Sequence, residues 1–249
     1  MKRWTCLILG ILSYLLFIVT IAYGVAFFGN LFVARTIDAA AGVPLEAALP
    51  VNAGLLLLFA LQHSGMARPA FKRRVAMAIP PKLMRSLYVA MSSVALIAIM
   101  VLWQPIGGVV WSIDTPLARQ AIMVVYFLGW VLMIWSTFLL DHFEMFGLRQ
   151  VWCEFRESKC VEPPFATPAA YKFVRHPVYA GWMIVVWASP VMTISHLVLA
   201  IGMTAYTLLG IRLEEAELAK RLPYYDQYRR KVPMLLPSLR KRLLGRADT

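Results

Sequence analysis

Long apolar runs alternate with short polar and basic segments along the chain. A helix needs about 20 predominantly apolar residues to cross a hydrocarbon core about 30 Å thick. Four runs reach or approach that length, and each is predicted to form a transmembrane helix. They are Trp4–Phe28, Ala47–Met66, Ser86–Trp103 and Gln120–Leu140. The first is too long for the core of a signal peptide and lacks a small-residue cleavage site, so we expect a retained anchor.

A fifth apolar run, Val178–Ile211, contains no Asp, Glu, Lys or Arg over 34 residues. As one helix it would reach about 51 Å at about 1.5 Å per residue, which is too long for a single crossing. Pro190 lies inside the run, and proline breaks helices because it has no backbone N–H. The pattern therefore predicts a helical hairpin, Val178–Ser189 followed by Thr193–Ile211, with a short first arm.

Basic residues are concentrated in alternate connections between the apolar runs. Of the 25 Lys and Arg residues, 23 precede the first run, join the second run to the third, join the fourth to the hairpin, or follow the hairpin. Only Arg35 and Arg119 lie in the other connections. Because cytoplasmic segments are enriched in Lys and Arg, we expect both termini in the cytoplasm and an even number of crossings.

The composition supports a membrane protein and excludes other classes. The 249 residues are 60% hydrophobic and 15% charged, with a net charge of +12, whereas soluble domains are about half apolar and about a quarter charged. Membrane topology explains the basic excess, so we expect no nucleic acid partner, and nothing indicates an obligate protein partner. We expect an all-α membrane protein without a Rossmann domain, forming one domain over 1–249 with a loose tail over 238–249.

The cysteines and histidines do not indicate a metal centre. Cys6, Cys153 and Cys160 lack the spacing of zinc ligands, and no pair of histidines has the spacing of an HExxH helix. Cys153 and Cys160 fall on the basic side that we expect to be cytoplasmic, where thiols stay reduced. We therefore expect no bound metal and no disulfide.

Ionisable residues near the ends of two apolar runs are candidates for chemistry. His63 lies in LQHSGMARPAFKRR, and Asp141, His142 and Glu144 lie in LLDHFEMFGLRQVW. Ionisable groups at membrane depth are costly and are functional candidates by default. Residues at i and i+3 share a helix face, so Asp141 and Glu144 can converge on one pocket. For His63 the alternative is solvation among the lipid headgroups.

A second polar cluster flanks the predicted hairpin. YKFVRHPVYAGW precedes it, and GIRLEEAELAKRLPYYDQYRRKVPMLLP follows from its end. A hairpin brings its own ends together, so Arg175–Tyr179 and Glu214 with Glu215 should lie on one membrane face. The alternative is a solvated helix end with ordinary ion pairs, such as Glu217 with Arg221. The tyrosines and the apolar VPMLLP segment favour a pocket for a zwitterionic ligand with an aromatic base.

These segments resemble a known family. RHPVYAGW, LEEAEL and YYDQYRRKVPMLLP resemble the cofactor-binding half of the isoprenylcysteine carboxyl methyltransferase superfamily of integral membrane enzymes. LQHSGMARPAFK and LLDHFEMFGLRQVW are similar to its NnrU-like branch, so the resemblance covers the chain from Leu61 onward. It implies S-adenosylmethionine as cofactor, bound by the region 171–237.

The resemblance also implies residue roles. The methionine end of the cofactor would contact Arg175, His176, Tyr179, Glu214 and Glu215, in a motif that includes Pro177 and Gly181. The adenosine would be covered by Tyr224, Tyr228, Arg229, Pro233 and Leu235, within the Pro233–Leu236 patch. The acceptor side would be lined by His63, Asp141, His142 and Glu144, with Asp141 and His142 as the first candidates for a general base.

The function implied is methyl transfer to a small thiol, in particular methanethiol, giving dimethyl sulfide and S-adenosylhomocysteine in a bacterial inner membrane. Such a thiol can enter from the lipid. One alternative keeps the fold and methylates a prenylcysteine carboxylate or another lipid. Another is a non-enzymatic role in nitrogen-oxide metabolism, with which NnrU-like proteins are associated. A transporter would need charges in mid-membrane and paired broken helices in two matching halves, which the sequence lacks.

Overall fold

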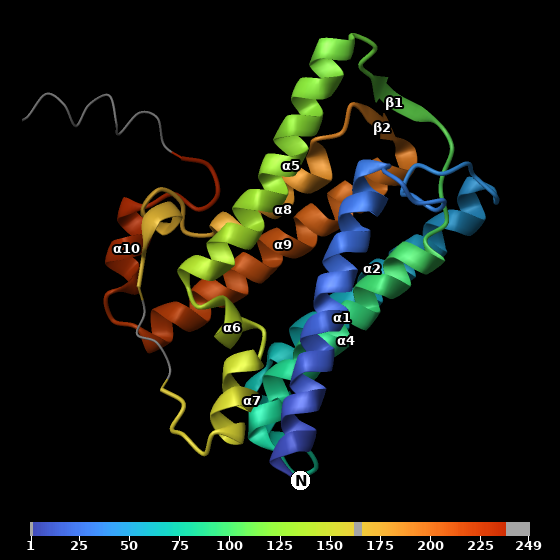
Figure 1. Cartoon of the computed structure of the whole chain (residues 1–249). Coiled ribbons are helices and arrows are strands. Elements are labelled where there is room, and N and C mark those ends of the chain that lie inside the picture. Colours follow the sequence, from blue (N-terminus) through green and yellow to red (C-terminus); the bar gives the residue numbers. More distant parts are fainter. Residues whose placement is uncertain (1, 162–165, 238–249) are drawn as a thin grey trace, which may run out of the picture.

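Five apolar helices dominate the computed structural model, which describes residues 2–161 and 166–237 (Figure 1). Within those residues, these five are long and apolar enough to cross a membrane, as the hydrophobic pattern predicts. They are α1 (Arg3–Gly29), α2 (Leu45–Ala67), α4 (Met84–Leu102, preceded by the short helix η1, Pro81–Leu83), α5 (Pro116–Leu139) and α9 (Ile194–Arg221). The expected all-α membrane fold is confirmed. The predicted tail, 238–249, lies outside the described residues.

The last apolar run is interrupted, as expected from Pro190. Helix α8 (Pro177–Trp187) has 11 residues, and α9 begins at Ile194. Helix α9 continues to Arg221, ten residues past the predicted end at Ile211. That boundary was wrong because the charged residues after Ile211 are mostly good helix formers, and these extend the helix beyond its apolar part. Helix α8 packs mainly against α5 and also contacts α9.

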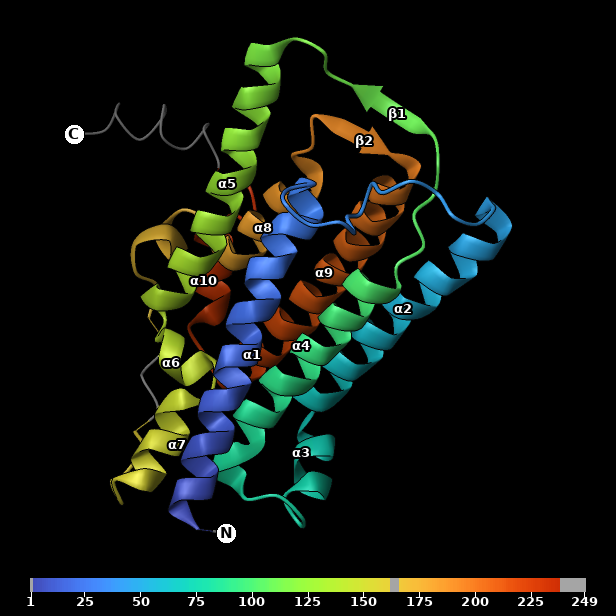
Figure 2. The same cartoon turned by 45° about the vertical axis from the view of Figure 1, so that its right-hand side comes forward.

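A two-stranded antiparallel sheet, which the apolar pattern does not predict, joins two connections at one end of the bundle (Figure 2). Strand β1 (Val109–Ser112) precedes α5, and β2 (Val191–Thr193) lies between α8 and α9. The indole Nε1 of Trp111 donates a hydrogen bond to the Ser189 carbonyl, at 3.2 Å. The sheet therefore satisfies backbone groups that the break at Pro190 leaves without helical partners.

A partly buried polar network joins the α1–α2 loop to the start of α9 at the same end. Asp38 accepts hydrogen bonds from Thr193 and Asn30, and its Oδ2 lies 3.3 Å from His196 Nδ1. Burial alone would raise the pKa of Asp38, but the hydrogen bonds and the nearby His196 outweigh it and hold that pKa below its usual value. Thr193 also caps α9 by accepting from the His196 amide, at 3.0 Å.

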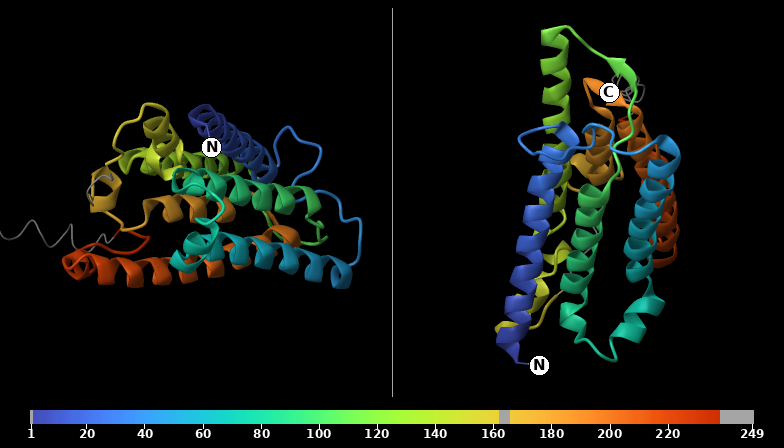
Figure 3. Two further views of the ribbon diagram at one scale, coloured as in Figure 1. Left: turned by 90° about the horizontal axis from the view of Figure 1, so that it is seen from below. Right: turned by 90° about the vertical axis from the view of Figure 1, so that its right-hand side faces the viewer.

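Short helices gather toward the opposite end, where α1 begins (Figure 3). In chain order they are α3 (Pro69–Val75), α6 (His142–Met145), α7 (Leu148–Phe155), η2 (Ala169–Lys172) and α10 (Tyr225–Lys231). Helix α7 packs against α1 and η1, and α10 contacts α9. Residues that sequence analysis singled out on α6, α8 and α10 thus lie away from the sheet.

Candidate functional site

Arg175, His176 and Glu215 meet where α8 begins and α9 nears its end. Arg175 Nε donates to Glu215 Oε1 at 2.7 Å, and His176 Nε2 lies 2.9 Å from the same oxygen. The side chains of Arg175 and Glu215 are each 10% exposed. Pro177 occupies the first turn of α8, where its missing N–H leaves no helical hydrogen bond unmade. The predicted convergence of RHPVY with the second glutamate of LEEAEL is confirmed by this geometry.

The segment after α10 folds back and attaches to the same residues. The backbone amides of Arg175 and His176 donate to the carbonyls of Pro233 and Met234, at 2.9 and 3.1 Å. Arg175 Nη1 donates to the carbonyls of Arg229 and Val232. Most donors of Arg175 therefore hold the chain in place, and Nη2 is its remaining group for a ligand within the described residues.

Glu214 occupies a different environment from Glu215. Its side chain is 45% exposed, and its Oε2 accepts from the Tyr179 hydroxyl at 3.0 Å. Tyr228, on α10, donates to the Tyr171 carbonyl at 2.6 Å, and burial is the main cause that raises its pKa to about 12. Glu214 is thus a negative charge that a ligand can reach, beside neutral phenols.

Lys72, on α3, interacts electrostatically with two further cations, Arg85 and Arg221. Partial burial and the positive charges of Arg85 and Arg221 lower the pKa of Lys72. Salt bridges within the described residues do not include any of the three, so their charge is open to an anion. These cations and the Glu214 carboxylate offer groups of both signs to a ligand with a carboxylate and a positive centre.

His63 is held by two hydroxyl groups of α4. Its Nε2 lies 2.6 Å from Tyr88 Oη, and its Nδ1 lies 3.0 Å from Ser92 Oγ. The ring of His63 stacks on Phe59, with centroids 5.1 Å apart. Next to it, Ser64 and Tyr206 are hydrogen-bonded at 3.1 Å, which joins α2 to α9. His63 therefore faces protein groups rather than lipid headgroups.

Asp141, His142 and Glu144 form a separate cluster around Arg149 and α1. Asp141 has φ of 85° and caps α6 by accepting from the Glu144 amide at 3.0 Å, while both carboxylates pair with Arg149. His142 lies 2.8 Å from Tyr14 Oη and 2.7 Å from Thr137 Oγ1 through its two nitrogens. Burial lowers the pKa of His142, and the charge of Asp141 only partly offsets this.

The predicted residues therefore divide among three locations, and their catalytic and binding roles stay predictions. Gly181 lies at the closest approach of α5 and α8, where a Cβ would be 2.6 Å from the Gly129 carbonyl oxygen. Its visible role is packing. Sequence reasoning did not select Tyr88, Ser92 or Tyr206, because each lies inside an apolar run with no charged residue next to it.

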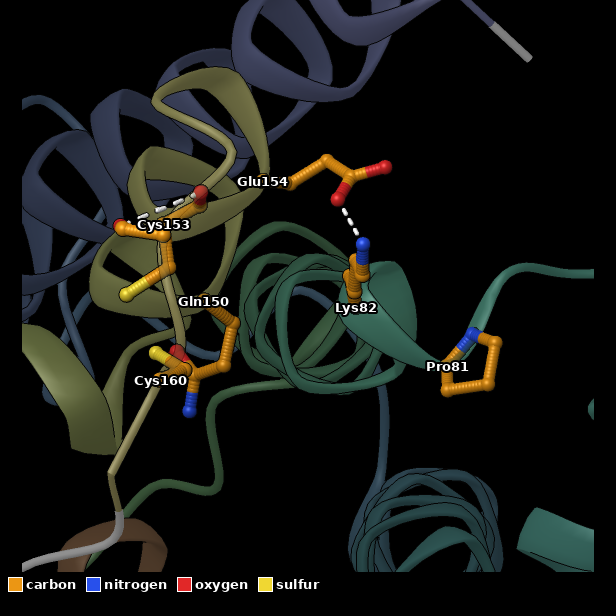
Figure 4. Close-up of a pocket in the computed structure, with 7 residues that line it drawn as sticks. Pro81, Lys82, Gln150, Cys153, Glu154 and Cys160 are labelled. Atoms are coloured by element: carbon orange, nitrogen blue, oxygen red, sulfur yellow. Dashed lines mark hydrogen bonds and ion pairs between the residues drawn. The ribbon is translucent and has the colours of Figure 1, made fainter.

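A shallow pocket of about 250 Å³ lies elsewhere, between η1 and α7 (Figure 4). Cys153 and Cys160 line it with Gln150, Lys82 and Glu154, and the two thiols interact with each other. None of the predicted cofactor or catalytic residues lines this pocket. We therefore do not assign the cofactor to it.

Known proteins similar to the chain identify its family. It is 43% identical to a methanethiol S-methyltransferase of Crocosphaera subtropica, over 97% of this chain and 95% of that protein. It is 42% identical to a methanethiol S-methyltransferase of Mycobacterium tuberculosis, over 95% of this chain and 98% of that protein. The chain belongs to the methanethiol S-methyltransferase family.

More distant similarity extends to animal proteins named Nurim. The chain is 33% identical to Nurim of Bos taurus over 66% of each chain. No protein-family model matches the chain, and no solved structure is a significant match. Family membership therefore confirms the recognition made from RHPVYAGW, LEEAEL and LLDHFEMFGLRQVW.

Proposed function

We propose that this protein transfers a methyl group from S-adenosylmethionine to methanethiol, giving dimethyl sulfide and S-adenosylhomocysteine. The observation that carries the proposal is identity of 42–43% to methanethiol S-methyltransferases over nearly the whole chain. The geometry supports it independently, because the residues expected at the methionine end of the cofactor meet between α8 and α9.

The site fits a zwitterionic methyl donor. When bound, S-adenosylmethionine supplies a methyl group activated by its sulfonium charge. The Glu214 carboxylate offers the counter-charge for an amino or sulfonium group, and the Tyr179 hydroxyl orients it. Lys72, Arg85, Arg221 and the Nη2 group of Arg175 offer positive charge for a carboxylate. The segment Pro233–Leu236 is attached to this region through the carbonyls of Pro233 and Met234.

The protein's task in this reaction is largely alignment. A direct displacement needs the thiol sulfur, the methyl carbon and the sulfonium sulfur in line, and fixing that geometry supplies much of the acceleration. A small apolar thiol partitions into lipid and can approach between helices. The charge asymmetry of the connections supports an orientation with both termini in the cytoplasm, in the inner membrane of a bacterium.

Headspace gas analysis tests the function directly. Membranes containing the full chain should form dimethyl sulfide only when methanethiol and S-adenosylmethionine are both added. Membranes from the same host without the protein are the control. Methylation of a prenylcysteine analogue with methanethiol left unchanged would retain the superfamily and overturn the acceptor.

A further inference from the structure

A cluster around His63 lies beside the proposed donor site although it is formed by other helices. Tyr88, on α4, hydrogen-bonds His63 and also lies within electrostatic reach of Glu214, on α9. Tyr179, the partner of Glu214, lies within electrostatic reach of Tyr88 and Tyr206. Tyr88 therefore interacts both with the imidazole of His63 and with the carboxylate that we assign to the methyl donor.

One face of α9 is open next to this cluster. Tyr206, Gly210 and Glu214 recur every four residues and so lie along one side of the helix. A Cβ added to Gly210 would meet no atom within 4 Å. No side chain therefore stands between Tyr206 and Glu214 along this side of α9.

The hydrogen bonds of His63 are compatible with the tautomer that accepts a proton at Nε2. With Nδ1–H donating to Ser92 Oγ at 3.0 Å, Nε2 is the acceptor for the Tyr88 hydroxyl at 2.6 Å. Ser92 Oγ also accepts from Gln62 Nε2 at 3.5 Å, while Gln62 Oε1 is buried without a partner among the described residues. The protein thus does not satisfy every polar group of the cluster itself.

We propose that Tyr88 and His63 form a proton relay that removes the thiol proton during methyl transfer. This assignment rests on the proposed function. The S–H bond of the thiol breaks as its proton passes to Tyr88 Oη, and the hydroxyl proton of Tyr88 passes to His63 Nε2. The thiol sulfur bonds to the methyl carbon, and the bond from that carbon to the sulfonium sulfur breaks with its electron pair left on that sulfur. His63 then returns its proton to solvent.

A relay is useful because few thiol molecules are ionised at neutral pH. A cysteine-like thiol has a pKa of about 8.5, so only a few per cent is thiolate at pH 7. Asp141 is less suited to this step, because it caps α6 and pairs with Arg149. His142, like His63, has a hydroxyl partner at each nitrogen, but its electrostatic partner is Asp141, whereas the Tyr88 partner of His63 also interacts with Glu214. The structure thus favours His63 among the candidates from the sequence.

Dimethyl sulfide formation across pH in Tyr88→Phe, His63→Gln and the double variant tests the relay. Each single variant should be slower by about 10²–10⁴-fold at pH 7, and the double variant should be no slower than the worse single variant, because the two groups act as a unit. The deficit should shrink as the pH approaches the thiol pKa. Affinity for S-adenosylmethionine, measured by calorimetry, should be unchanged.

Tyr126→Phe is the matched control, because it removes a buried hydroxyl that bonds the Val25 carbonyl outside the site. Its activity should equal that of the wild type, and melting temperatures will show whether each variant is folded. Additive losses, a deficit constant with pH or full activity of Tyr88→Phe would overturn the relay while leaving the methyltransferase assignment intact. Absence of product from the wild type at every pH would overturn both.

Discussion

Arg175 and Glu215 form a hydrogen-bonded ion pair, Nε to Oε1 at 2.7 Å, with 10% of each side chain exposed. Removing one partner leaves the other charge buried without its ion pair, and breaking a buried pair typically costs about 3–5 kcal/mol. We expect Glu215→Ala and Arg175→Ala each to lower the melting temperature in detergent and to weaken S-adenosylmethionine binding. The double variant should be more stable than the sum of the two losses implies. Strictly additive losses would show that the pair is not coupled.

Glu214 should affect binding without affecting stability. Its side chain is 45% exposed, so Glu214→Gln leaves no buried charge behind. We expect the affinity for S-adenosylmethionine to fall by about 1.5–3 kcal/mol, the size of a charge-assisted hydrogen bond. Isothermal titration and thermal melting on the same preparation separate the two effects. Unchanged affinity would remove Glu214 from the donor site.

Gly181 should be required for packing. A Cβ at this position would lie 2.6 Å from the Gly129 carbonyl oxygen and 2.7 Å from the Met133 nitrogen. Both are backbone atoms, so Gly181→Ala must push α5 and α8 apart, and overpacking of this kind costs about 1–3 kcal/mol. Gly210→Ala is the matched control, because its Cβ meets open space and alanine should stabilise the helix by about 0.5–1 kcal/mol. Equal melting temperatures for the two variants would contradict this interpretation.

His142 gives stability a defined pH dependence. Burial lowers its pKa, so the folded state binds fewer protons than the unfolded state in the window below about 6.5, the usual histidine value. Its contribution is complete above that value and is lost as pH falls toward the lowered folded pKa. The stability of the wild type relative to His142→Gln should therefore fall as pH drops from 7 to 5. A constant difference would exclude a shifted pKa.

Cys160 should react slowly for an exposed thiol. Partial burial and the neighbouring Cys153 raise its pKa to about 11. Because the thiolate is the nucleophile, maleimide labelling should accelerate steadily between pH 7 and pH 10 without reaching a plateau. Mass spectrometry of the labelled peptide measures the rate, and Cys160→Ser is the control for labelling elsewhere. A plateau near pH 8.5 would indicate an ordinary cysteine.

Most of the long helices could be predicted from the sequence, because a long apolar run indicates a membrane-spanning helix. The interruption between α8 and α9 near Pro190 could also be predicted, since proline lacks the backbone N–H that a helix needs. Strand β1 could not be, because its four residues, Val109–Ser112, are stabilised by pairing with Val191–Thr193 and not by a periodic pattern of their own. The extension of α9 to Arg221 was considered only as an alternative, because the apolar pattern indicates the membrane-spanning part of a helix and not its full length.

The contacts of the candidate site could be predicted only where a sequence motif contains several charged residues. The meeting of Arg175 with Glu215 could be expected from a hairpin, but the bonds from Arg175 to the carbonyls of Arg229 and Val232 could not, because main-chain acceptors have no residue signature. The cluster of His63 with Tyr88 depends on the packing of α2 against α4. The apolar run that forms α2 does not show which of its faces contacts α4, and the run that forms α4 does not show which of its faces contacts α2.

The attachment of the segment after α10 distinguishes two kinds of sequence change. Its bonds to the amides of Arg175 and His176 come from the backbone carbonyls of Pro233 and Met234. Backbone carbonyls are the same in every residue, so substitutions at 233 and 234 leave both acceptors in place. Adding or deleting one residue after Lys231 would instead shift both acceptors out of register with the amides. In this segment, chain length is therefore under tighter constraint than side-chain identity.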